Sequence, residues 1–247
     1  MPTYKIERCT VEDAAGLARN NMSAFWTDPT WILIWEEGRS RESVIEASTG
    51  SSLSVSALET WFLTPDNSQI MFEEEITDSR AHKRHLKAIE VETGTIVGYV
   101  RFVLPDRLSG DWLDAQTPDA TAEEKEEFAQ RSARADWTFR EGPGNIDEPV
   151  GVIKEKYRGR KEYMELDYLA VQPAYRHRGI ASMLVAAGVA ESERMGIDIF
   201  MLAYKAGLGV YKRLGFNTLE TLIIDDTPWG GKGEYGCYFM ERTVKKP

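Results

Sequence analysis

Residues 166–181 decide the fold, and they read Leu-Asp-Tyr-Leu-Ala-Val-Gln-Pro-Ala-Tyr-Arg-His-Arg-Gly-Ile-Ala. The pattern around this stretch predicts a β-strand over 163–171, a polar turn over 172–178, and a helix over 180–195 that ends before a glycine. Gly179 stands where the helix begins. A helix N-terminus presents unpaired backbone N–H groups and about half a positive charge. The turn is therefore a candidate anion-binding site.

The residues of this turn match what a pyrophosphate requires. Such a loop needs one position without a Cβ atom and another that is small, and Gly179 and Ala181 supply them. Arg176 and Arg178 add positive charge to a chain whose formal net charge is −10. Taken alone, the pattern also suits an ordinary strand-to-helix connection with solvated arginines. The run Tyr-Lys-Arg-Leu-Gly-Phe at 211–216 follows after one more predicted strand. Its presence favours an anion-binding turn over an ordinary connection.

The stretch resembles motif A of the GNAT N-acetyltransferase superfamily, whose pattern Q/R-x-x-G-x-G/A is matched by Arg176, Gly179 and Ala181. Alanine is the less common choice beside glycine at the last position. Residues 211–216 are similar to the family's downstream Y-x-x-x-G-F signature. The sequence Leu-Asp-Tyr-Leu-Ala-Val-x-Pro, which begins at residue 166, further resembles the longer, fungal-type members of this superfamily. Close matching covers residues 163–216.

The resemblance implies a mixed α/β fold, the GNAT acyl-CoA N-acyltransferase fold. Its central, mostly antiparallel sheet would be flanked by helices and splayed at the strand that ends near Val171. Acetyl-CoA would be the co-substrate, with its pantetheine arm in the split and its pyrophosphate on the turn. The residues expected to bind it are Leu169, Ala170, Val171, Arg176, His177, Arg178, Gly179, Ile180, Ala181 and Ser182.

Acylation of an amine requires a neutral nucleophile, whereas an alkylamine with a pKa of about 10.4 is protonated at pH 7. Glu165 and Asp167 are the candidate general bases, since residues two apart share a face of a regular strand. Glu165 matches the glutamate that serves as base in some histone-type members. Each carboxylate has the alternative of a sheet-edge or ion-paired group, and water is the third candidate base.

The leaving thiolate of coenzyme A needs a proton donor, and Tyr211 matches the tyrosine that the family places there. The alternative for Tyr211 is a packed aromatic ring. A backbone N–H near Val171 would polarise the carbonyl. Cys9 and Cys237 lie outside the motif, which favours direct attack in a ternary complex over a covalent enzyme intermediate.

Length and composition set the remaining expectations. The chain has 247 residues and is predicted to form a single domain, 1–247, with an insertion at about 106–160 that has too few large apolar residues for its own core. The acidic charge disfavours nucleic acid as a partner, and no apolar run is long enough for a membrane span. His82, His85 and His177 have no metal-ligand spacing, so no metal is expected. The expected location is the cytoplasm.

The remaining elements follow from periodicity and breakers. Strands are expected over 4–8, 86–92, 96–104, 197–202, 218–224 and 236–242, and helices over 10–25, 119–135 and 208–214. The Gly-rich loop 225–236 is the candidate for acceptor contacts. Broken helical segments are expected over 26–84, where tryptophans stand at 26, 31, 35 and 61.

Three functions fit these features. The first is acetylation of a small-molecule primary amine, which the aromatic N-terminal half and the insertion favour because they suit a closed pocket. The second is acetylation of a lysine or an N-terminus of a protein or peptide, which the acidic surface could attract. The third is a non-catalytic acyl-CoA-binding module, against which the presence of both Tyr211 and Glu165 argues.

Overall fold

The computed structural model describes residues 2–51, 80–134 and 148–245. It contains the strands β1 (Tyr4–Arg8), β2 (Lys83–Glu90), β3 (Thr95–Val103), β4 (Met164–Val171), β5 (Ile199–Tyr204), β6 (Asn217–Asp225) and β7 (Glu234–Arg242). The α-helices are α1 (Ala14–Phe25), α2 (Arg41–Ser51), α4 (Ala122–Arg134), α5 (Glu148–Arg158), α6 (Ile180–Met195) and α7 (Leu208–Arg213). Short 3-10 turns lie at Val11–Asp13, Trp31–Ile34, Asp106–Leu108, Leu113–Ala115, Pro173–Tyr175 and Thr227–Trp229.

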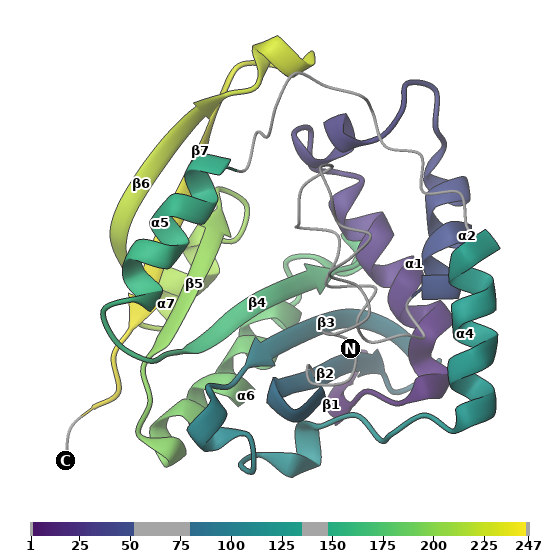
Figure 1. The fold of residues 1–247 in the computed structure, drawn as a ribbon, viewed down its shortest axis with the longest axis horizontal. Helices are drawn as coiled ribbons and strands as arrows, with labels where there is room; N and C mark the ends of the chain where they lie inside the picture. The colour runs from purple at the N-terminus through teal and green to yellow at the C-terminus, as the bar shows by residue number, and fades with distance from the viewer. Residues whose placement is uncertain (1, 52–79, 135–147, 246–247) are drawn as a thin grey trace.

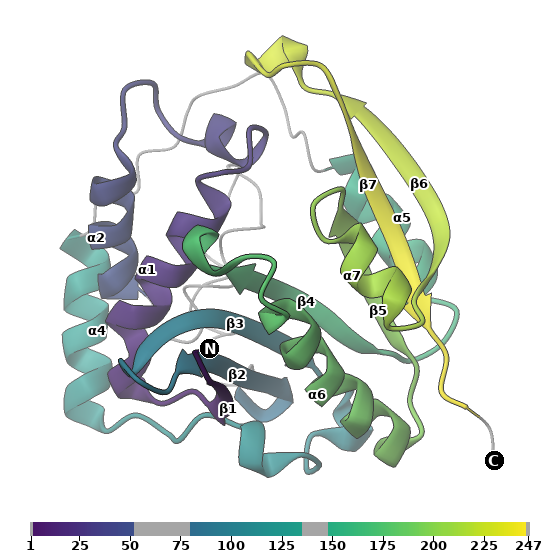
Figure 2. The same cartoon turned by 180° about the vertical axis from the view of Figure 1, so that it is seen from behind.

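The seven strands form one sheet in the order β1-β2-β3-β4-β5-β7-β6 (Figure 1). Every neighbouring pair is antiparallel except β4 and β5, which are parallel. That pairing runs from Met164 with Ile199 to Leu166 with Met201 and goes no further along the two strands. Beyond Leu166 the strands diverge, as Figure 2 shows. The predicted mixed α/β fold with a sheet splayed at the strand ending near Val171 is confirmed.

A bulge at Asp167 interrupts β4. Arg101 of β3 is opposite Tyr168, and the next residue of β3 is opposite Leu166, so Asp167 has no partner of its own. Side chains consequently change faces at this point: Leu166 packs in the core that contains α6, whereas Tyr168 packs with α1. The expectation that Glu165 and Asp167 share a face assumed a regular strand, and the strand is not regular there.

Helices α1 and α6 cover opposite faces of the β3–β4 part of the sheet (Figure 2). On the α6 face the core contains Phe102, Ile180 and Leu184, all fully buried. Gly188 of α6 permits this contact, because a Cβ atom there would lie 2.0 Å from the ring of Phe102. The helix therefore lies close enough to the sheet for its N-terminus to reach the end of β4.

The insertion is more regular than its sequence suggests. Besides the predicted helix, which the structure places at α4, it contains α5, which covers the β5–β7 part of the sheet (Figure 1). Pro149 and Gly151 are poor helix formers and weaken the helical pattern of α5. The proline is tolerated because it lies in the first turn of the helix. Val150 and Tyr157 are buried and pack α5 against the sheet. The ring centroids of Tyr157 and Phe200 lie 5.7 Å apart. Whether the whole chain is a single domain stays a prediction.

The broken helical region 26–84 is partly outside the described residues, including Trp61. Trp26, Trp31 and Trp35 form one aromatic cluster at the end of α1, with ring centroids 5.6–6.3 Å apart. Contrary to expectation, Lys83 and Arg84 belong to strand β2. Within the described ranges, no helix is long and apolar enough to cross a membrane.

Candidate active site

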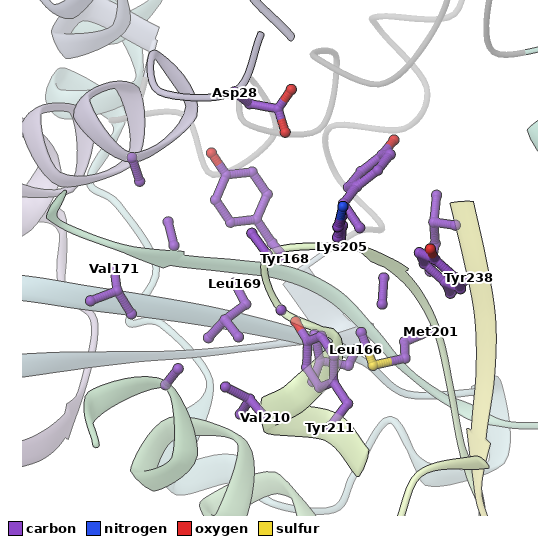
Figure 3. A pocket seen from close by; sticks show the side chains of 18 of the residues that line it. Asp28, Leu166, Tyr168, Leu169, Val171, Met201, Lys205, Val210, Tyr211 and Tyr238 are labelled. Carbon is purple, nitrogen blue, oxygen red and sulfur yellow. The ribbon is translucent and has the colours of Figure 1, made fainter. Parts of the chain in front are cut away.

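A continuous cavity of about 1240 Å³ lies where β4 and β5 diverge and extends past β4 to the end of α1 and to strand β7 (Figure 3). Most residues predicted for the site line it. They are Glu165, Asp167, Leu169, Ala170, Val171, Arg176, His177, Gly179, Ile180, Ala181, Ser182 and Tyr211. Arg178 is the predicted residue that does not. The structure therefore brings the two separate sequence motifs to one place.

The turn into α6 presents its backbone to the cavity. Gly179 has φ +83 and His177 has φ +63, a left-handed conformation that is uncommon for residues other than glycine. The first helical hydrogen bond joins Met183 N–H to the Gly179 carbonyl at 3.0 Å, which leaves the N–H groups of the preceding helical residues for another acceptor. A Cβ atom on Gly179 would meet nothing within 4 Å. The space in front of the turn is therefore open.

The two arginines of the turn hold it to the rest of the protein. Arg176 donates from Nη2 to the carbonyl of Ala24 at 3.0 Å and to Oγ1 of Thr27 at 2.7 Å. Arg178 donates to the Tyr4 hydroxyl at 3.1 Å and lies over the ring of Tyr175. Their charges remain close to the turn while their side chains fix its position against α1 and β1.

Asn20, which sequence reasoning missed, fixes the end of β4. Its side chain is fully buried. Its Oδ1 accepts from the Gln172 N–H at 3.2 Å, and its Nδ2 donates to the Ala170 carbonyl at 3.4 Å. The available signal was that Asn20 is a polar residue within the apolar stripe of the predicted helix 10–25. A buried amide requires hydrogen-bond partners, so its position predicts contacts with another part of the chain.

Tyr211 lies at the opposite end of the β4 edge from the turn. The ring is buried and packs edge-on against Phe216, with centroids 5.8 Å apart. Gly207 allows its approach, since a Cβ atom there would lie 2.7 Å from the ring. Burial raises the pKa of the Tyr211 hydroxyl above its ordinary value. The phenol is therefore protonated at neutral pH and can donate a proton.

Glu165 is held in a two-pronged ion pair. Arg158 of α5 donates from Nε to Oε1 and from Nη2 to Oε2, both at 2.8 Å. Such parallel hydrogen bonds use both carboxylate oxygens. The contact joins α5 to β4 at the edge of the cavity. The role of Glu165 as general base stays a prediction, and this pairing favours a structural role.

Asp167 is paired with a buried cation. Arg101 donates from Nε to Oδ2 at 2.7 Å, and its Nη2 contacts the same oxygen. Burial alone would raise the pKa of Asp167, but the positive charges of Arg101, Lys154 and Lys83 outweigh it, so the pKa lies below its ordinary value. A carboxylate with a lowered pKa is a weak base. Its assignment as general base also stays a prediction.

A contact between two loops lies at the far part of the cavity, whose lining includes Thr30. Thr30, after α1, donates from Oγ1 to Oδ2 of Asp226 at 3.0 Å, and the other oxygen of Asp226 accepts from the Gly233 N–H at 2.8 Å. Sequence reasoning missed this pair, whose members lie 196 positions apart. From the predicted acceptor loop 225–236, Glu234, Tyr235 and Gly236 line the cavity. Contact of that loop with an acceptor stays a prediction.

Residues 108–216 match the acetyltransferase (GNAT) family. This stretch of the chain matches a GNAT acetyltransferase domain. Acetyl transfer from acetyl-CoA to an amine is therefore the activity that the family assigns to it. In residues 2–51, 80–134 and 148–245, no group of three or more His, Cys, Asp or Glu side chains could hold a metal ion.

Solved structures of other acetyltransferases share the fold of this GNAT protein. The Drosophila melanogaster polyamine N-acetyltransferase, which forms N-acetylagmatine, is 12% identical with TM-score 0.53, covering 98% of this chain and 100% of its own. An acetyltransferase of Corynebacterium glutamicum, described as histone acetyltransferase HPA2 and related acetyltransferase, is 19% identical with TM-score 0.52, covering 100% and 99%. Mosquito arylalkylamine N-acetyltransferase like 5b is 11% identical with TM-score 0.51, covering 98% and 100%. A sequence comparison with curated proteins gives no match.

Proposed function

We propose that this GNAT protein transfers the acetyl group of acetyl-CoA to a small-molecule primary amine, by direct attack in a ternary complex. The observation that carries the proposal is the continuous cavity. It joins the turn at the start of α6, the diverging edge of β4 and Tyr211 to a space on the other side of β4 that Phe25 and Tyr168 also line. One cavity can therefore hold both substrates at once.

The described residues fit coenzyme A. The N–H groups at the start of α6 suit a pyrophosphate, and the open space in front of Gly179 leaves room for it. Past Leu166, β4 has no strand beside it on the β5 side, so its backbone is available to amides of the pantetheine arm. We assign acetyl-CoA binding to Leu169–Val171 and Arg176–Ser182, mainly through the backbone.

The chemistry then follows from the residues at the split. Acetyl-CoA supplies an activated acyl group: the C–N bond forms as the C–S bond breaks. Tyr211 protonates the departing sulfur and recovers its proton from solvent. A backbone N–H on the uncovered edge of β4 polarises the carbonyl, and because Tyr211 lies beside Leu166 in Figure 3, this N–H belongs nearer to Leu166 than to Val171, where the sequence had suggested it. Because Glu165 and Asp167 are both ion-paired, we assign the removal of the amine proton to water in the cavity.

The lining of the acceptor space supports a small amine over a polypeptide, because side chains from separate parts of the chain, Phe25, Lys154 and Tyr235, border it together. The hydrogen bond of Thr30 to Asp226 ties the loop after α1 to the loop after β6. The polyamine and arylalkylamine N-acetyltransferases that share the fold are named for small amines, which agrees with this choice.

The proposal is tested by screening an amine library for release of the coenzyme A thiol, alongside lysine-containing peptides. We expect turnover with small primary amines and little with peptides. Calorimetry and thermal shift with acetyl-CoA form the second measurement, where stabilisation by mass action is expected. Acetyl-CoA binding without turnover of any amine would favour a non-catalytic binding module, and absence of binding at millimolar acetyl-CoA would remove the proposal altogether.

A further inference from the structure

Asp28 differs from the other carboxylates that line the cavity. Glu165 and Asp167 are paired with arginines, and Glu234 is exposed on β7. Asp28 uses Oδ1 to accept from the N–H groups of Thr30 at 2.9 Å and Trp31 at 3.0 Å. Across the described ranges, no cation forms an ion pair with it. One carboxylate oxygen is thus committed to the backbone, and no cation of the described residues neutralises the charge of the group.

The surroundings of Asp28 suit an organic cation. Phe25 and Tyr168 pack edge-to-face with centroids 5.0 Å apart, and Phe25 lies 5.6 Å from Trp31. Figure 3 shows the carboxylate of Asp28 facing the hydroxyl end of Tyr168 across the cavity. Phe25 and Tyr168 also line the cavity. A carboxylate beside aromatic rings combines charge attraction with an apolar surface for the body of an amine.

The position of Asp28 shows which part of an acceptor it would meet. In Figure 3 Asp28 and Tyr168 lie on one side of β4, whereas Leu169, Val171 and Tyr211 lie on the other. The nitrogen that attacks the thioester must be neutral, and a nearby carboxylate would stabilise its protonated form. An anion on the other side of β4 from the proton donor therefore suits a group that stays charged throughout the reaction.

We infer that Asp28 selects acceptors that carry a second cationic group, and that this group binds Asp28 while the other amine is acetylated. The inference rests on the proposed function and names its substrate class: diamines with an apolar or aromatic segment between the two nitrogens. The site is preorganised, because the contact of Thr30 with Asp226 and the backbone bonds of Asp28 hold the loop. Little ordering is then required when the amine binds.

The test compares two amines that differ by one charge. p-Xylylenediamine and 4-methylbenzylamine share a ring and a reacting amine, and kcat/KM is measured for the acetylation of each, because it counts only amines bound in the reactive orientation. Asp28→Asn keeps an Oδ1 acceptor for the backbone and removes the charge. We expect the variant to lower kcat/KM for the diamine by about tenfold or more, as for loss of a hydrogen bond to a charged group, and for the monoamine by less than about threefold.

Glu36→Gln is the matched control, since it removes an exposed carboxylate that follows the same loop and does not line the cavity, and it should leave the preference for the diamine intact. Equal losses for both amines in Asp28→Asn, no loss for either, or a wild-type protein that does not prefer the diamine would each overturn the inference. The proposed function is judged separately, by acetyl-CoA binding and by turnover of the monoamine. A protein that acetylates 4-methylbenzylamine without preferring the diamine would keep the function and lose the inference.

Discussion

The two walls of the cavity are held by different kinds of contact. The cofactor wall consists of residues 169–171, 176–182 and 211, and local backbone geometry sets most of it. Gly179 takes a left-handed conformation at the helix start, and β4 keeps an edge that no strand covers. Such features arise within a short stretch of chain, although hydrogen bonds of Arg176, Arg178 and Asn20 also tie this wall to α1 and β1.

The acceptor wall consists of residues 24–30, 165–168 and 234–238, and side chains from distant parts of the chain hold it. Thr30 bonds to Asp226, and Arg101 of β3 bonds to Asp167. Because of this difference, substitutions can impair one wall of the cavity without impairing the other. Changes in the cofactor wall should act on acetyl-CoA and the chemical step, whereas changes in the acceptor wall should act on stability and on the choice of amine.

The largest effect is expected at Gly179, where valine should abolish acetyl-CoA binding in a protein that stays folded. The residue has φ +83, which a β-branched side chain rarely adopts, and its side chain would fill the open space in front of the turn. Calorimetry with acetyl-CoA measures the loss, and circular dichroism confirms the fold. Wild-type affinity in Gly179→Val would mean that the phosphates bind elsewhere.

The next effect concerns the proton donor on the same wall. Tyr211→Phe keeps the packing against Phe216 and removes the hydroxyl, so kcat should fall by roughly 10²–10⁴-fold with little change in KM for acetyl-CoA. The measurement is steady-state kinetics over a pH range in which chemistry limits turnover. A rate within about threefold of wild type would show that the ring is only packed, and would leave water as the acid.

The cofactor wall and most of the sheet could be predicted from the sequence because their signals are local. Apolar runs located β4, before a polar turn, and β5, after Gly196, to within two residues, and α6 begins and ends at the predicted positions 180 and 195. Helix α5 was not predicted, because Pro149 and Gly151 lower the helix signal of its first turn and its stabilising contact, Tyr157 on Phe200, is long-range.

The acceptor wall was harder to predict because its contacts depend on register and on long-range pairing. A one-residue bulge at Asp167 places the side chains that follow it on the opposite face of the sheet from the one a regular strand would give. No local sequence pattern predicts this bulge. The partner of Glu165 lies on a helix that the sequence did not predict. The Asp28-Pro29-Thr30 run did signal a turn, yet its nearness to Asp226 follows from the fold.

On the acceptor wall, Asp167→Asn should lower the free energy of unfolding by about 2–4 kcal/mol, because it leaves the guanidinium of Arg101 buried without its counter-ion. About a quarter of the Asp167 side chain is exposed, which places the effect below that of a fully buried pair. Chemical denaturation measures it. A change smaller than about 0.5 kcal/mol would show that water already stabilises Arg101.

The same pair gives a pH dependence with a definite sign. The folded-state pKa of Asp167 lies below its ordinary value, so its stabilisation is present at neutral pH, above the unfolded pKa of about 3.9, and is lost as the pH falls toward the folded value. The stability difference between wild type and Asp167→Asn should therefore shrink below about pH 4. Denaturation curves collected from pH 7 to pH 3 test this, and a difference that stays constant would exclude the linkage.

The smallest effect is expected at Glu165, and it separates the two roles of that residue. If Glu165 holds α5 through Arg158, Glu165→Gln should lower the free energy of unfolding by less than about 1 kcal/mol and leave kcat within about threefold, since Arg158 is 42% exposed and water screens the pair. If Glu165 is the general base, kcat should instead fall by roughly 10²–10⁴-fold while stability hardly changes. Arg158→Met is the matched control, because it breaks the same ion pair and keeps the carboxylate. A double-mutant cycle then isolates the pair's coupling energy. Loss of activity in Glu165→Gln but not in Arg158→Met would establish the catalytic role and move Glu165 from the structural contacts of the acceptor wall to its chemistry.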